Sequence, residues 1–290
     1  MTDKDTILNN WDFSAVPSPC YVLHETLLVM NLEVIDKVRK ATGAEVILAL
    51  KANAMWSIFP ELRKHADGAT ASSLAEARLV FEEYGERAHT YAPVYAGQEI
   101  DEILDYSSHI TFNSLNQYRR FGGQARKTGV SCGLRVNPEY STVETDLYNP
   151  ASPTSRLGIR SVDLEEWPEG VEGLHFHSLC ESRPDDLEGT LKAVEERFGR
   201  FFPLLKWINF GGGHLMTHSD YDENIAVLFN KFSRLFYSCK FFSVIINRKI
   251  APSEKITSLS ASCHNLAERF CCLCFKCFYL IVRNKFVCVF

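Results

Sequence analysis

Residues 44–52 read AEVILALKA, in which the apolar run Val46–Leu50 is followed directly by Lys51. The run has the length of a strand, and a strand that is buried on both faces of a parallel sheet is continuously hydrophobic rather than alternating. Six further runs of this kind follow between Gly68 and Gly212, and longer amphipathic segments separate them. This alternation predicts repeated βα units and an α/β fold built on a parallel sheet.

The expected elements can be bounded from the runs themselves. The strands are Ala44–Leu50, Gly68–Ala71, His89–Val94, His109–Asn113, Ser131–Asn137, Val171–Ser178 and Trp207–Gly212. The helices are Leu74–Tyr84, Glu99–Tyr106, Leu115–Ala125, Asp185–Phe198 and Tyr221–Phe232. Seven strands are one short of an eight-stranded, TIM-like (β/α)8 barrel. We therefore expect an incomplete barrel, for which the apolar run Phe241–Ile246 is the candidate eighth strand.

Charge and composition exclude several classes of partner. The 290 residues carry a formal net charge of −5, and the isoelectric point is near 6.0. Nucleic acids and anionic membrane surfaces need a concentrated basic surface, so we expect neither as a partner. No apolar run approaches the ~20 residues that span a bilayer, and the N-terminal residues lack the apolar core of a signal peptide. We expect a cytoplasmic protein that acts on a small molecule.

Cysteine is concentrated in the C-terminal part of the chain. Seven of the ten cysteines follow residue 200, and four of them crowd into residues 271–277. These four, together with His264, are one candidate for a zinc site. Structural zinc sites usually show two paired clusters at characteristic spacing, which this segment lacks, so we expect no metal.

Lys51 is the first candidate for chemistry. An amine at the end of a strand, next to an apolar layer, is desolvated and therefore easier to deprotonate, as a lysine that forms a Schiff base requires. The alternative is a lysine whose stem packs on apolar surface while its charge reaches solvent.

A run of three glycines, Gly211, Gly212 and Gly213, follows the last expected strand. Consecutive glycines let backbone N–H groups close on a phosphate, and loops after the late strands of a barrel often hold one. The alternative is a tight turn, which a single glycine could make.

Two histidines end another expected strand. Period-two alternation puts His175 and His177 on the same face, where an imidazole can stack on a planar cofactor. A zinc pair and hydrogen-bonded core histidines are the alternatives. The irregular segment between Pro138 and Pro168 would form a long loop on the catalytic face of a barrel, or a solvated excursion.

Together these segments resemble the carboxynorspermidine/carboxyspermidine decarboxylases, which are pyridoxal phosphate-dependent enzymes with a barrel of the alanine racemase type. The resemblance runs from about Pro17 to about Phe236. It is carried by PCYVL at 19–23, LALKA at 48–52, TASSLAEAR at 70–78, FNSL at 112–115, LRVNPE at 134–139, VETDLY at 143–148, SRLG at 155–158, GLHFHSLCE at 173–181 and WINFGGGH at 207–214.

This resemblance implies roles for individual residues. Lys51 would bind pyridoxal 5'-phosphate covalently and move protons at the substrate Cα, and His177 would stack on the pyridine ring. Arg135 would support the ring, and Gly211, Gly212 and Gly213 would receive the phosphate. Arg156 and Cys180 would approach the substrate.

The implied reaction is decarboxylation of a carboxylated triamine to norspermidine or spermidine, by an enzyme whose relatives are homodimers. The alternatives are another barrel-type amino-acid decarboxylase or racemase, acting on diaminopimelate, ornithine or alanine, or a non-catalytic pyridoxal phosphate-binding protein.

The resemblance divides the chain into three parts. Residues 1–26 are an N-terminal strand segment, residues 27–236 the cofactor-binding barrel, and residues 237–290 a divergent, cysteine-rich tail. The family's Glu-Pro-Gly-Glu segment and its β-rich domain are not recognisable in that tail. Our hypothesis is that the tail comes from a truncated or misjoined reading frame, which sequencing the transcript across codons 234–240 would test.

Overall fold

The structure is a computed structural model that describes residues 20–143, 147, 149–180, 182–214, 241–246, 278–282 and 285–289. The chain divides into two compact units. One comprises Met1–Val34 with Lys249–Phe290, and the other is Ile35–Arg248. Helix α2, Glu25–Thr42, runs across the boundary between them.

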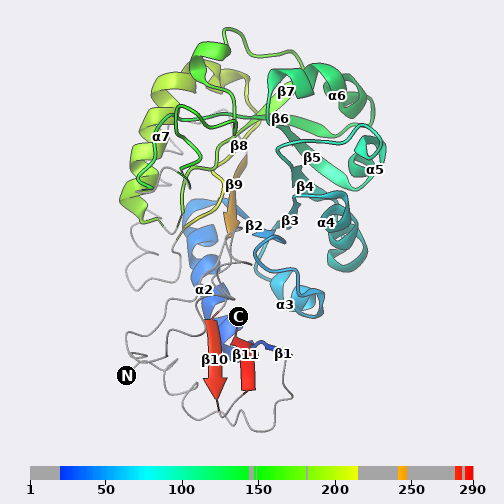
Figure 1. Cartoon of the computed structure of the whole chain (residues 1–290), viewed down its shortest axis with the longest axis vertical. Helices are drawn as coiled ribbons and strands as arrows, with labels where there is room; N and C mark the ends of the chain where they lie inside the picture. The colour runs from blue at the N-terminus through cyan, green and yellow to red at the C-terminus, as the bar shows by residue number, and fades with distance from the viewer. Residues whose placement is uncertain are drawn as a thin grey trace. The chain divides into compact units, whose positions relative to one another are not determined.

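Eight parallel strands form a closed ring in the unit Ile35–Arg248 (Figure 1). They are β2 Glu45–Ala49, β3 Gly68–Ala71, β4 Ala88–Tyr91, β5 Ser107–Phe112, β6 Ser131–Arg135, β7 Val171–His175, β8 Trp207–Asn209 and β9 Phe241–Ile246. Each strand from β2 to β8 pairs in parallel with the next one in the chain, and β9 returns to pair with β2. The predicted α/β barrel is confirmed.

The closed ring differs from the incomplete barrel that the sequence predicted. Strand β9 is the apolar run that was the candidate eighth strand, and it aligns Phe241 with Trp207 of β8 and Ser243 with Glu45 of β2. An open edge would leave a row of unpaired backbone N–H and C=O groups on both β8 and β2. Pairing both edges with one strand removes that cost. The predicted helix Tyr221–Phe232 lies outside the described residues.

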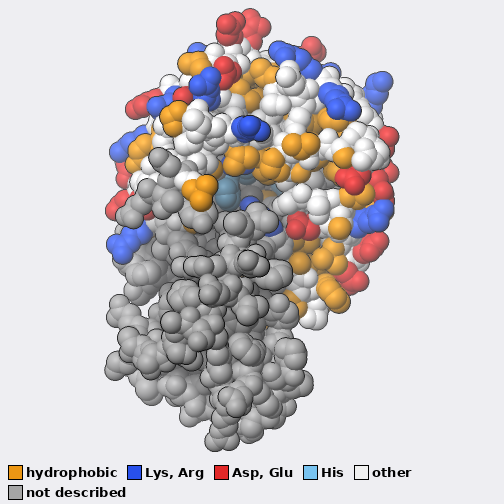
Figure 2. Space-filling model, viewed as in Figure 1, with side chains coloured by type: hydrophobic (Ala, Val, Ile, Leu, Met, Phe, Trp, Pro, Cys, Tyr) orange, Lys and Arg blue, Asp and Glu red, His pale blue; other side chains and the backbone are white. Residues whose placement is uncertain are grey.

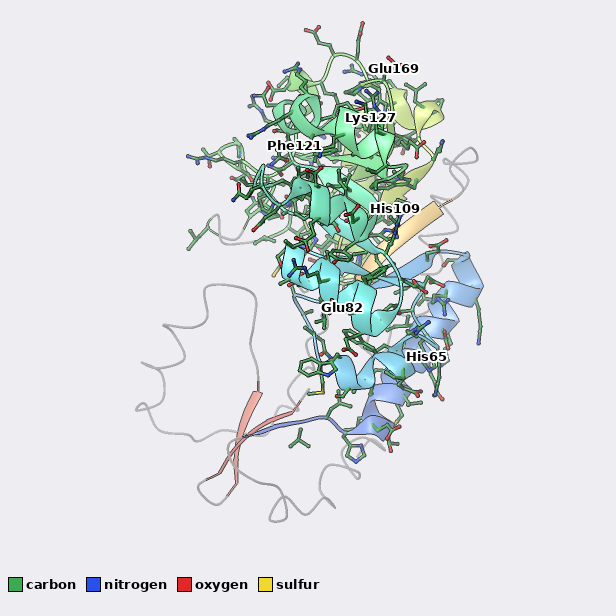
Figure 3. All side chains as sticks on the ribbon, turned by 90° about the vertical axis from the view of Figure 1, so that its right-hand side faces the viewer. His65, Glu82, His109, Phe121, Lys127 and Glu169 are labelled. Carbon is green, nitrogen blue, oxygen red and sulfur yellow. The ribbon has the colours of Figure 1, made fainter. Side chains whose placement is uncertain are left out.

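Helices lie outside the strand ring (Figure 1). The α-helices of this unit are α3 Phe59–Leu62, α4 Leu74–Leu79, α5 Ile100–Asp105, α6 Leu115–Lys127 and α7 Pro184–Phe198, with a π-helical turn, η3 Val80–Tyr84, after α4 and short 3-10 turns η2 Trp56–Ile58, η5 Ser161–Asp163 and η6 Gly199–Leu204. Helix α6 shows why such segments become helices. The Ser114 side chain accepts a hydrogen bond from the backbone N–H of Gln117 (3.2 Å), and Phe121, labelled in Figure 3, lies on the buried face of the helix.

Large side chains fill the barrel near the start of β8. The indole of Trp207 donates to Ser131 Oγ (2.9 Å) and meets the ring of His109 edge to face at 5.5 Å. His109, marked in Figure 3, stacks in turn on His89 with ring centroids 4.0 Å apart. The indole fits because Gly173 has no side chain: a Cβ there would lie 1.9 Å from the Trp207 ring. This layer makes the barrel a packed core rather than a pore.

The other unit holds a three-stranded sheet in the order β1-β11-β10. Strand β1, Cys20–Val22, lies parallel to β11, Lys285–Val289, and β11 is antiparallel to β10, Phe278–Val282. The cysteine cluster at 271–277 and His264 lie outside the described residues. In the part of the chain that the structure describes, no helix is both long and apolar enough to cross a membrane.

Candidate active site

The candidate site lies where the barrel strands end. Lys51 follows β2 by two residues, Arg135 is the last residue of β6, and His177 follows β7 by two residues. Parallel strands bring their C-terminal ends to one rim, which is where barrel enzymes build active sites. These three side chains line a cavity of about 50 Å³. Figure 2 shows a hollow on the described surface in which histidine and Lys or Arg atoms are visible.

Lys51 lies at the rim and is exposed, whereas the sequence predicted a desolvated amine. Leu50 is the last residue of the buried apolar run, with 2% of its surface exposed. The chain then turns, because the N–H groups of Ala52 and Asn53 both donate to the carbonyl of Ala49 (2.9 and 3.1 Å). This turn lifts Lys51 beyond the apolar layer. Lys51 therefore lines the cavity while remaining exposed.

Arg135 is buried and held by two hydrogen bonds. Its Nη1 donates to the hydroxyl of Tyr91 (2.5 Å), and its Nη2 donates to the carbonyl of His177 (3.0 Å). The guanidinium also lies over the Tyr91 ring, 5.0 Å from its centroid. The Nε group is buried without a hydrogen-bond partner. Because buried donors are rarely left unpaired, this Nε marks a place for an acceptor.

His177 is a neutral, fixed imidazole. Its Nδ1 accepts a hydrogen bond from the backbone N–H of Gly212 (3.0 Å), so the ring proton lies on Nε2. Burial, and then the positive charges of Lys51 and Arg135, hold the pKa of His177 well below its usual value. The rings of His175 and His177 are 20° from parallel and 6.4 Å apart, which confirms that they share a face.

The glycine turn packs against the segment after β7. Gly211 and Gly213 have φ angles of +70° and +99°. A Cβ on Gly211 would lie 2.5 Å from the carbonyl oxygen of Phe176, and one on Gly213 would lie 2.2 Å from that of Leu179. Both positions therefore need glycine for conformation and for space.

Two of the three backbone N–H groups that the sequence predicted to bind a phosphate donate to protein side chains instead. The N–H of Gly211 donates to Asn209 Oδ1 (2.8 Å), and the N–H of Gly212 donates to His177 Nδ1. A phosphate that used either amide would have to replace these bonds. The phosphate role of the turn stays a prediction.

Arg156 and Cys180 are both exposed, and neither lines the cavity among the described residues. The carbonyl of Arg156 accepts a hydrogen bond from Asn113 Nδ2 (2.8 Å). The N–H of Cys180 donates to Ser182 Oγ (3.1 Å). Their proposed contacts with substrate stay predictions.

Sequence reasoning missed Tyr91 and Asn209, which both line the cavity. Tyr91 holds Arg135, and Asn209 bonds to the side chain of His175 and to the N–H of Gly211. Each is the last residue of its strand, β4 or β8. The predicted strands His89–Val94 and Trp207–Gly212 ran past both positions, so the rule that barrel sites form at strand C-termini did not single them out.

Comparison with known proteins finds decarboxylases among the similar proteins. No family model matches the chain. The carboxyaminopropylagmatine decarboxylase of Synechocystis sp. is 47% identical over 222 residues, which are 76% of this chain and 57% of that protein. The carboxynorspermidine/carboxyspermidine decarboxylase of Campylobacter jejuni is 41% identical over 223 residues, which are 76% of this chain and 58% of that protein. The chain thus spans little more than half the length of these curated relatives.

Solved structures agree with the sequence relatives. The carboxynorspermidine decarboxylase of Campylobacter jejuni, complexed with norspermidine, superposes with a TM-score of 0.70 at 36% identity, covering 80% of this chain and 59% of that one. The diaminopimelate decarboxylase of Helicobacter pylori superposes with a TM-score of 0.64 at 14% identity, covering 84% of this chain and 65% of that one, and shows the shared fold. Over about three quarters of its length, this chain is similar in sequence to carboxyaminopropylagmatine decarboxylase and to carboxynorspermidine/carboxyspermidine decarboxylases.

Proposed function

We propose that this chain provides the cofactor-binding barrel of a pyridoxal phosphate-dependent decarboxylase that acts on a carboxylated polyamine precursor. The observation that carries the proposal is the convergence of Lys51, Arg135 and His177, from the ends of three separate strands, on one cavity. The relatives are decarboxylases of carboxyaminopropylagmatine and of carboxynorspermidine or carboxyspermidine. We also expect the protein to be cytoplasmic and to form a homodimer.

The residues present fit the cofactor chemically. Lys51 offers an amine to an aldehyde, His177 offers a neutral ring, and the buried Nε of Arg135 offers a donor without a partner. The cavity of about 50 Å³ is smaller than the roughly 300–1,000 Å³ of most ligand sites. Side chains at the rim, Lys51 first among them because it is exposed, would therefore move on binding.

Each residue then has a role that its geometry supports. Lys51 would hold the cofactor and exchange a proton with the substrate Cα. His177, fixed by the Gly212 amide, would stack without adding charge. Arg135, fixed by Tyr91 and the His177 carbonyl, would donate from Nε. When bound, pyridoxal phosphate supplies the electron sink that makes loss of carbon dioxide possible.

The substrate class follows from the chemistry that the relatives' names share. Each names an amino acid that carries a long cationic tail. Among the described residues that line the cavity there is no carboxylate, while Lys51 and Arg135 are cationic. The cavity therefore suits the α-carboxylate end of such a molecule. Its cationic tail would be recognised elsewhere in the protein.

Cofactor titration tests the proposal. Purified chain, titrated with pyridoxal 5'-phosphate, should gain the visible absorption band of a lysine-bound cofactor, and Lys51→Ala should lose it. Lys64→Ala is the matched control, because Lys64 is exposed on the same unit and pairs only with Glu61 at the surface. Borohydride reduction and peptide mapping should place the label on Lys51.

Turnover separates the decarboxylase from the alternatives. The loaded protein should release carbon dioxide from carboxynorspermidine, carboxyspermidine or carboxyaminopropylagmatine, and not from diaminopimelate or ornithine. If the protein shows the cofactor band but releases no carbon dioxide from any of these substrates, it is a non-catalytic cofactor-binding protein, and the proposal of a decarboxylase is overturned. Absence of the band at saturating cofactor would overturn both.

A further inference from the structure

Asn113 lies just beyond the end of β5 and connects two parts of the rim. Its Oδ1 accepts hydrogen bonds from the hydroxyl of Tyr91 (3.0 Å) and from the backbone N–H of Gly158 (2.9 Å), and its Nδ2 donates to the carbonyl of Arg156 (2.8 Å). An amide oxygen has two lone pairs, so both are used. One side chain thus joins strand β4 to the loop that carries Arg156.

The position of Asn113 is itself fixed. Its backbone N–H donates to Gln117 Oε1 (2.8 Å), and Gln117 Nε2 donates to the carbonyl of Pro93 (2.7 Å). Gln117 belongs to the first turn of α6. The backbone of Asn113 is therefore held by the start of α6 and by the loop after β4, through groups other than those that its side chain bonds at the rim.

The loop that Asn113 holds is pressed against the end of β6. Gly158 has φ +87°, and a Cβ there would lie 2.6 Å from the backbone of Val136. The N–H of Ile159 donates to the carbonyl of Arg135 (2.9 Å), and the N–H of Asn137 donates to the carbonyl of Ile159 (2.9 Å). The loop has two separate attachments, one to the β6 backbone and one to the Asn113 amide.

Tyr91 extends the connection into the cavity. Its hydroxyl donates to Asn113 and accepts from Arg135 Nη1. The bonds therefore run without interruption from Arg135, through Tyr91 and Asn113, to the Arg156–Gly158 backbone. The Tyr91 hydroxyl both donates and accepts a hydrogen bond, so its orientation is fixed. Displacement of Arg135 would therefore change the hydrogen bonds of Asn113, and displacement of Asn113 would change those of Arg135.

We propose that Asn113 and Tyr91 are positioning residues that couple the cofactor-side Arg135 to the substrate-side loop Ser155–Gly158. The consequence for catalysis rests on the proposed function, whereas the coupling itself is a property of the chain. If the cofactor accepted a hydrogen bond from Arg135 Nε and shifted Arg135, the shift would pass through Tyr91 and Asn113. It would then change the position of the backbone that carries Arg156.

Hydrogen exchange in the cofactor-free chain tests the coupling independently of activity. Asn113→Ala removes the acceptor of the Gly158 amide and should speed its exchange about tenfold, while the Ile159 amide, bonded to Arg135, changes less. Asn116→Ala is the matched control, because Asn116 is exposed on α6 and its side chain accepts a hydrogen bond from Arg119 at the surface. It should leave both amides unchanged.

Tyr91→Phe tests the relay. It should speed exchange at Gly158 about threefold, although Tyr91 does not touch Gly158, and the double variant should exchange no faster than Asn113→Ala alone. If the Gly158 amide of the double variant exchanged about thirtyfold faster than in the wild type, the two effects would be independent, and the coupling would be overturned. Equal exchange in Asn113→Ala and Asn116→Ala would overturn the role of Asn113. Asn113→Asp keeps an acceptor for the Gly158 amide but loses the donor to the Arg156 carbonyl, so it should restore only part of the protection. Partial recovery separates lost bonding from misfolding.

The loaded protein adds a catalytic readout. Asn113→Ala should raise KM for the carboxylated substrate about tenfold with kcat nearly unchanged, and Tyr91→Phe should also weaken cofactor binding. An unchanged KM in Asn113→Ala would overturn the link to substrate. If wild-type chain binds no cofactor, the proposed function has failed, and the exchange experiment still decides the coupling.

Discussion

Replacing Gly173 with alanine should destabilise the barrel because no space exists for the added methyl group. A Cβ at this position would lie 1.9 Å from Cε2 of Trp207 and 2.1 Å from two further ring atoms. Ordinary contact with carbon begins near 3.4 Å, so the overlap is about 1.5 Å. Either the indole or strand β7 must move.

Neither can move freely. The indole is held by its bond to Ser131 Oγ and by the ring of His109, and β7 is paired on both sides, with β6 and with β8. Overpacking a core that cannot relax costs about 1–3 kcal/mol, and this overlap belongs at the upper end. At about 2–4 °C per kcal/mol for a chain of this size, Gly173→Ala should lower Tm by roughly 6–12 °C.

Gly123→Ala is the matched control for this prediction. Gly123 is exposed within α6, and a Cβ there meets nothing within 4 Å. Alanine is a better helix former than glycine, so Gly123→Ala should raise the free energy of unfolding by about 0.5–1 kcal/mol. Urea unfolding followed by far-UV circular dichroism measures both. Unfolding free energies that agree within about 0.5 kcal/mol would refute the described packing of Trp207.

Two further predictions follow from the buried cationic and imidazole groups. Burial lowers the pKa of His109 to about 4, of His175 to about 3 and of His214 to about 4. The unfolded chain therefore binds more protons below pH 6.5. The stability that these neutral histidines contribute is complete above that pH and should be lost between about pH 6.5 and 3, on the order of 1–3 kcal/mol per histidine. Acid titration of the unfolding free energy checks this, and a flat profile over that range would contradict it. Arg135→Lys should weaken pyridoxal phosphate binding about 10–100-fold, because an ammonium cannot bond Tyr91 and the His177 carbonyl in one plane while offering a third donor; equal dissociation constants in a spectroscopic titration would rule that role out.

Much of the barrel could be predicted from the sequence, because the apolar runs that indicate strands are local features. Strand β3 has the predicted bounds Gly68–Ala71, and β2 lies within the predicted strand Ala44–Leu50. The shared face of His175 and His177 follows from the two-residue period of a strand, which any extended backbone imposes. The resemblance then supplied roles that the residues alone left open.

Tertiary structure decided the contacts between residues that are far apart in the sequence. Pairing with two edges made Phe241–Ile246 the closing strand, and a turn after Ala49 exposed Lys51. The hydrogen bond from the Gly212 amide to His177 crosses 35 residues, and the bond from Arg135 to Tyr91 crosses 44. The sequence indicates where each strand lies and which of its residues are apolar, whereas the tertiary structure fixes where each strand ends and which ends meet at the rim.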